Sequence, residues 1–153
     1  MRIVEFLNPQ SVIVPLASHT KSAVLRELCE ALETAKPGLG VDRLTQVLEE
    51  REKLGSTGIG DGVAIPHGKI SGVTQLIASF GISKEGIAFD AMDGKLAHLF
   101  FALLAPENSA GLHLKALARI SRLFKNNPFR ETLLSLPDAA HVYQFMTDED
   151  LKS

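Results

Sequence analysis

The chain has 153 residues and a formal net charge of −2 at pH 7, and 45% of its residues are hydrophobic while 22% are charged. These values are typical of one soluble globular domain, so we expect residues 1–153 to form a single unit, and the lack of a dense basic stretch argues against nucleic acid as a partner. No apolar run is long enough to span a bilayer, no secretory signal is expected at Met1, and the single cysteine excludes an internal disulfide, which together predict a cytoplasmic protein without direct membrane insertion.

The first third of the chain predicts two helices after a short strand. Ser18 or Thr20 can cap the first helix, which places Cys29 on its apolar side as a buried thiol, and Asp42 can cap the second helix. In chain order, the predicted elements are a helical turn over 2–6, a strand over 12–14, a helix from about 20 to 35 and a helix over 42–52.

The middle of the chain predicts strands separated by glycine-bearing turns, and the last third predicts helices again. The run Leu99–Leu104 is apolar on both faces, which is typical of a central strand. The predicted strands cover 63–65, 76–82, 87–89 and 96–104, and the predicted helices that follow cover 112–125, 129–136 and 139–151. This order of helices, strands and helices predicts an α/β sandwich rather than a regular βαβ repeat.

One segment, Leu54–Lys69 with the sequence LGSTGIGDGVAIPHGK, combines a glycine-rich loop, a β-branched stretch, a proline and a histidine. The imidazole of His67 is neutral for much of the time at cytosolic pH, so one of its ring nitrogens can attack phosphorus. Pro66 fixes the backbone directly before it. Phosphoryl transfer depends mainly on positioning and on charge neutralisation, both of which such a loop can supply. We therefore take His67 as the candidate phosphoryl acceptor.

Residues around this loop can supply donors and positive charge to a phosphoryl group. Glycines permit backbone N–H groups to approach closely, hydroxyls add further donors, and a guanidinium can bind phosphate through a bidentate fork. Arg51 has the right chemistry, although on residue type alone a solvated arginine at a helix end is the simpler interpretation. Asp61 is expected to be a turn residue, and Lys69 fits a solvated lysine as well as a charge near the site. The candidate phosphate-binding residues are Ser56, Thr57, Gly58 and Gly60.

The segment resembles the active-site signature of the IIA components of the bacterial phosphotransferase system, and it is most similar to the nitrogen-type IIA proteins. The likeness extends over nearly the whole chain, including the apolar run LAHLFFALLAP. It implies the mannitol-type IIA fold, an α/β sandwich in which helices flank a mixed β-sheet of about five strands. It also implies that His67 accepts a phosphoryl group from a histidine-containing phosphocarrier, that Arg51 binds this group, and that His113 faces His67 as a further catalytic residue. Without the resemblance, His113 is equally an unpartnered histidine at a helix start.

The nitrogen-type resemblance implies a regulatory protein whose phosphorylation state changes which proteins it binds. Potassium transporters and sensor kinases, in nitrogen and carbon metabolism, are the kinds of target that it suggests. A sugar-specific, fructose-type IIA component that passes the group to a IIB domain is the alternative, although the chain ends soon after its IIA segment and carries no IIB part. A binding module whose histidine is never phosphorylated is a third hypothesis.

No cofactor and no metal are expected from the sequence. It contains no Walker A motif, its glycine spacing is not that of a dinucleotide-binding loop, and no closely spaced ligand pair accompanies His67 and His113 as a zinc site would require. His19, His98 and His141 have no motif around them, so we expect them to be solvated or packed.

Overall fold

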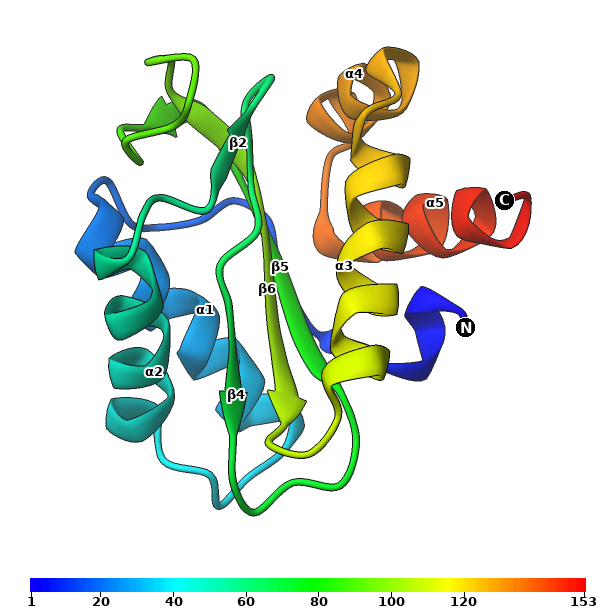
Figure 1. Ribbon diagram of the computed structural model, residues 1–153. Coiled ribbons are helices and arrows are strands. Elements are labelled where there is room, and N and C mark those ends of the chain that lie inside the picture. Colours follow the sequence, from blue (N-terminus) through cyan, green and yellow to red (C-terminus); the bar gives the residue numbers. More distant parts are fainter.

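A six-stranded mixed sheet separates two layers of helices (Figure 1). The computed structural model describes all residues from 1 to 153. The strands are β1 (Leu7–Ile13), β2 (Gly58–Gly60), β3 (Val63–Ala64), β4 (His67–Ile70), β5 (Ile77–Ile87) and β6 (Ala97–Pro106). Their order is β1-β5-β6-β3-β2, and β4 also pairs with β6. Strands β3 and β4 run parallel to β6, β1 runs parallel to β5, and the pairs β5–β6 and β2–β3 are antiparallel.

Helices α1 and α2 cover one face of the sheet, and α3, α4 and α5 cover the other (Figure 1). Their bounds are α1 (Lys21–Ala35), α2 (Val41–Lys53), α3 (Ala110–Phe124), α4 (Asn127–Ser135) and α5 (Ala139–Leu151), and a short 3-10 turn, η1 (Ile3–Glu5), precedes β1. None of the helices is both long and apolar enough to cross a bilayer.

Each face of the sheet has its own hydrophobic core, because side chains alternate along a strand. Phe101 of β6 points into the core beneath α3 to α5, where it contacts Phe80 and Phe124. The neighbouring Phe100 points into the core beneath α1 and α2, where it contacts Phe89. Strand β6 is therefore apolar on both faces, as the sequence predicted for a central strand.

An interruption between β3 and β4 determines where His67 lies. Both short strands pair with β6: β3 pairs at Leu99 and Phe100, and β4 pairs from Leu103 onward. They therefore lie one after the other along the same side of β6. Pro66 lies in the gap, where its carbonyl accepts the Leu103 N–H at 2.9 Å, but it has no N–H of its own to donate. His67 is the first residue after this break and begins β4.

The helices agree well with the sequence prediction, with differences at their first residues. Thr20, rather than Ser18, caps α1, because its side chain accepts the Ala23 N–H. Helix α2 begins at Val41, and its N-cap is Gly40 with φ of 93°, so the prediction that Asp42 is the cap was wrong. Asp42 instead lies in the first turn, where a carboxylate favours the helix dipole.

The strands differ more from the prediction. The two strands predicted over 76–82 and 87–89 are one strand, β5, which passes through an irregularity between Ile82 and Ile87 and leaves Phe89 outside. Strand β1 extends over seven residues rather than three. Strands β2 and β4 were not predicted, which explains why the sheet has six strands where about five were expected. The prediction of an α/β sandwich with a mixed sheet is confirmed.

Candidate functional site

His67 is half-buried and is held by the main chain. Its Nδ1 lies 2.7 Å from the carbonyl oxygen of Ile65, two residues earlier. A carbonyl oxygen can only accept a hydrogen bond, so the proton of the neutral ring is on Nδ1. The lone pair is therefore on Nε2, which is the nucleophilic nitrogen of this histidine.

His113 lies against His67. It is in the first turns of α3, it is 7% exposed, and its ring centroid is 5.5 Å from that of His67 with an angle of 73° between the rings. Its Nε2 is buried and has no hydrogen-bond partner. A buried polar atom without a partner destabilises a fold by about 1–3 kcal/mol, which makes this atom a candidate contact for a group that arrives during function.

Burial lowers the pKa of both histidines. For His67, the main cause is desolvation; the positive charge of Arg51 also lowers the pKa, while the bond to Ile65 and the charge of Glu52 oppose this. For His113, desolvation again lowers the pKa most, followed by the positive charge that His67 carries when protonated and by the charge of Lys69. Both rings are therefore kept neutral at pH 7, and a neutral imidazole is the form that can act as a nucleophile.

Arg51 lies in the last turn of α2, beside the strand that carries His67. Its side chain is half-buried, and its Nη1 donates to the carbonyl oxygen of Gly55 at 2.9 Å. Its positive charge helps to lower the pKa of His67, whose strand packs against α2. Of the three residues predicted to be catalytic, the structure thus places His67 and His113 against each other and Arg51 on the helix that packs beside the strand of His67.

Glu52, which the sequence analysis missed, organises the loop after α2. Its carboxylate accepts both the hydroxyl and the backbone N–H of Thr57, the latter at 3.1 Å. Lys21 at the start of α1 compensates the buried charge of Glu52 at 3.0 Å and also lies over the ring of Phe89 at 4.7 Å from its centroid. In the sequence, only its position next to Arg51 could have pointed to a role for Glu52 at the site. Its partner Lys21 comes from a distant part of the chain.

The candidate phosphate-binding residues of the loop already make bonds within the protein. The Ser56 hydroxyl donates to the Phe89 carbonyl at 2.7 Å and accepts the Gly58 N–H at 3.0 Å, and both donors of Thr57 are bound to Glu52. Gly60 has φ of 94° and lies against Asp93. A phosphate contact by Ser56, Thr57, Gly58 or Gly60 stays a prediction, and for Ser56 and Thr57 it requires these internal bonds to rearrange.

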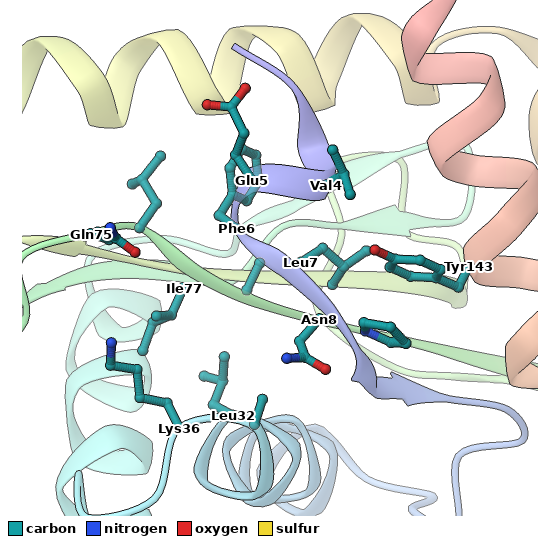
Figure 2. A pocket seen from close by; sticks show the side chains of 14 residues that line it. Val4, Glu5, Phe6, Leu7, Asn8, Leu32, Lys36, Gln75, Ile77 and Tyr143 are labelled. Atoms are coloured by element: carbon teal, nitrogen blue, oxygen red, sulfur yellow. The ribbon is translucent and has the colours of Figure 1, made fainter.

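The remaining histidines lie outside the site. His98 binds the carbonyl of Ser83 through Nδ1 at 3.0 Å, while His19 and His141 lie close to exposed carboxylates. A groove at the opposite edge of the sheet, beside β1, is lined by η1, the end of α1 and Tyr143 of α5 (Figure 2). Strands β5 and β6 separate it from β4 and His67.

Comparison with known proteins identifies the family. The family model described as "Phosphoenolpyruvate-dependent sugar phosphotransferase system, EIIA 2" matches residues 5–149. The chain belongs to the EIIA 2 family. This EIIA 2 chain is 37% identical over 146 residues to a protein of Bradyrhizobium diazoefficiens named nitrogen regulatory protein, and the match covers 95% of both chains. It is 32% identical over 150 residues to the PTS system fructose-specific EIIABC component of Bacillus subtilis, a match that covers 98% of this chain and 24% of that longer protein.

Solved structures agree with this assignment of the EIIA 2 chain. The nitrogen regulatory protein IIA-Ntr from Neisseria meningitidis has a TM-score of 0.88 and 37% identity, with 95% of this chain and 99% of that chain covered. IIA mannitol from Escherichia coli shares the fold with a TM-score of 0.75 at 20% identity, with 91% and 97% covered. The predicted mannitol-type IIA fold is therefore confirmed.

Proposed function

We propose that residues 1–153 act as one IIA domain of the nitrogen-type phosphotransferase system and accept a phosphoryl group on Nε2 of His67. The observation that carries the proposal is the pairing of His67 and His113. The first ring has Nδ1 bound to a main-chain carbonyl and Nε2 free, and the second places an unpartnered buried nitrogen beside it. The donor would be a histidine-containing phosphocarrier, as befits a family of phosphotransferase components.

The proposed step exchanges one P–N bond for another. The lone pair of His67 Nε2 attacks the phosphorus of the donor's phosphohistidine, the new N–P bond forms, and the donor's P–N bond breaks with its electron pair left on the donor's ring. The proton on Nδ1 of His67 stays in place, so the phosphorylated ring carries a positive charge beside the phosphoryl oxygens. No water, metal or cofactor is consumed, and the step is reversible because the bonds broken and formed are alike.

Three groups would stabilise the phosphoryl oxygens. The Arg51 guanidinium would turn from the Gly55 carbonyl and bind them through its fork, and His113 would donate from Nε2 once its neutral ring carries the proton there. The start of α3, which carries His113, adds N–H groups without intrahelical partners and the positive end of the helix dipole. Contacts from Ser56, Thr57, Gly58 and Gly60 are part of the same proposal.

The regulatory side of the proposal rests on the names of the relatives, which are nitrogen regulatory proteins in Bradyrhizobium diazoefficiens and Neisseria meningitidis. Phosphorylation places about two negative charges on the phosphoryl oxygens, only partly offset by the positive ring, and this change is enough to favour or exclude a protein partner. Potassium transporters and sensor kinases are the proposed targets. We place this activity in the cytoplasm, where a chain whose one thiol is buried and unpaired is stable.

A sugar-specific role is the second candidate, because the EIIABC component of Bacillus subtilis carries a similar segment. In that case the phosphoryl group would pass from His67 to a IIB domain. Adding a purified fructose-type IIB protein to the phosphorylated chain distinguishes the sugar-specific role from the regulatory one. Transfer within seconds would favour the sugar-specific role, and retention of the group on His67 would favour the regulatory one.

Intact-mass analysis tests the acceptor itself. The chain is mixed with phosphoenolpyruvate, Enzyme I and the phosphocarrier, alongside the His67→Ala variant and, as a matched control, His141→Ala on the exposed face of α5. We expect an acid-labile gain of one phosphoryl group in the wild type and in His141→Ala, and none in His67→Ala. A wild type that gains nothing from an active donor pair would refute the proposal and favour a binding module.

A further inference from the structure

We propose that Gly68 is a positioning residue, whose missing side chain lets α2 pack directly against β4 and thereby brings Arg51 within reach of the phosphoryl group on His67. The inference rests on the proposed function, because it concerns the group that His67 accepts. It assigns a role to Gly68, the residue after His67. Gly68 itself takes no part in the chemistry.

The contact between Gly68 and α2 is closer than any side chain would permit. A Cβ placed on Gly68 would lie 2.7 Å from Cγ1 of Val47, 3.7 Å from Leu104 and 3.8 Å from the carbonyl oxygen of Val47. Gly68 is not in the left-handed region, so its backbone is one that alanine adopts. Packing alone, and not backbone conformation, therefore requires glycine here.

The helix cannot easily avoid the clash by a side-chain movement. Valine is β-branched and is restricted to essentially one rotamer within a helix, so its Cγ1 cannot swing away freely. An added methyl group would have to displace α2 from β4 by about 0.7 Å to restore ordinary contact at 3.4 Å.

The same contact sets the distance between the two functional groups. Val47 and Arg51 are four residues apart on α2, so they lie on the same face of the helix, one turn from each other. Gly68 and His67 are neighbours on β4, so a Cβ on Gly68 would point toward α2 while the His67 side chain points to the opposite face of the sheet. Moving α2 outward at Val47 therefore moves Arg51 away from the strand that carries His67. A misplacement of this size lowers the rate of a positioned reaction by about tenfold to hundredfold.

The test measures the rate of phosphoryl transfer from the phosphocarrier at several donor concentrations, for the full chain and its variants. We expect Gly68→Ala to lower kcat by about tenfold or more with little change in KM, because donor docking is not altered. Val47→Ala removes the atom that the new methyl group meets, so the double variant Val47→Ala/Gly68→Ala should recover most of the rate.

A matched control has the same kind of clash at another place. A Cβ on Gly81 of β5 would lie 2.5 Å from Leu16, and β6 separates this strand from β4. Gly81→Ala should lower the melting temperature but not kcat, provided that each variant is assayed below its own melting temperature. Gly68→Ala should also have less than about a twofold further effect when Arg51 is already alanine, since the two changes act on one interaction.

The outcomes separate this inference from the proposed function. Wild-type chain that is phosphorylated on His67, together with an unaffected Gly68→Ala variant, would overturn the role of Gly68 and leave the proposed function intact. A slow Gly68→Ala variant that Val47→Ala does not rescue, or whose effect adds in full to that of Arg51→Ala, would also overturn it. A wild-type chain that is never phosphorylated would overturn both.

Discussion

The buried ion pair between Arg119 and Asp150 supports a quantitative prediction about stability. The Asp150 side chain is 2% exposed and accepts the Arg119 Nε–H at 2.6 Å through one oxygen. Its other oxygen accepts the Ile3 N–H at 2.6 Å, so this carboxylate joins α3 and α5 to the start of the chain. The Asp150→Ala substitution would leave the Arg119 Nε–H and the buried Ile3 N–H without their carboxylate acceptor and the guanidinium without its counter-charge, while Arg119 Nη2 keeps its bond to the main-chain carbonyl of residue 150 at 2.9 Å.

We expect Asp150→Ala to lower the free energy of unfolding by about 3–5 kcal/mol, the usual cost of removing one member of a buried pair. For a chain of this length, each kcal/mol corresponds to about 2–4 °C, so the melting temperature should fall by about 10 °C. Urea unfolding followed by circular dichroism measures the free energy, and calorimetry measures the temperature. Glu149→Ala on the same helix loses only the exposed pair with Lys152 and should change stability by at most about 1 kcal/mol.

A double variant tests whether the loss of stability comes from the unpaired charge. Arg119→Met combined with Asp150→Leu removes both charges, and it should cost less than Asp150→Ala alone, because only the Ile3 N–H is left unpaired. The reasoning would be refuted if Asp150→Ala lost less than about 1 kcal/mol, or if the double variant were less stable than the single one.

Four further predictions concern the histidines and the cysteine. Because burial lowers the pKa of His67 below its ordinary value of 6.5, the rate of transfer should stay level as pH falls through 6.5 and decline only at lower pH; a decline centred at 6.5 would contradict this. The folded state then binds fewer protons than the unfolded state near pH 6, so the free energy of unfolding should also decrease as pH falls through 6.5. His113→Leu should slow phosphoryl transfer by about 100-fold. It should nevertheless raise the free energy of unfolding by about 1 kcal/mol, because it removes an unpartnered buried nitrogen. A variant that urea titration shows to be destabilised would argue that His113 is structural. Burial raises the pKa of Cys29 to about 11, so a thiol reagent at pH 8 should label it only after unfolding, and rapid labelling of the native chain would show that the thiol is accessible.

The helices could be predicted from the sequence, and His67 could be selected as the candidate acceptor, because both signals are local. The period of apolar residues marks α1, α2 and α3, and the motif around His67 singles out one histidine among five. Strand β1 was predicted too short because Asn8, Pro9 and Gln10 are exposed on a sheet edge, where polar residues are tolerated.

The short strands and the supporting contacts depend on distant parts of the chain. Strand β4 contains four residues, including a glycine and a lysine, and becomes a strand only by pairing with β6, more than thirty residues later. The bonds of Glu52 to Thr57 and Lys21 likewise join α2 to the loop that follows it and to α1. A periodic pattern does not record such pairings, so the residues that hold the site could not be found in the way that His67 was.

If His67 is phosphorylated as proposed, the carbonyl of Ile65 makes the choice of ring nitrogen insensitive to mutation. In many proteins a carboxylate side chain orients the reactive histidine, and one substitution can remove it. Here the orienting atom belongs to the main chain in the gap between β3 and β4, and every amino acid supplies that oxygen. Sequences can therefore vary widely around His67 while the same ring nitrogen remains the reactive one, provided that the strand still breaks at Pro66.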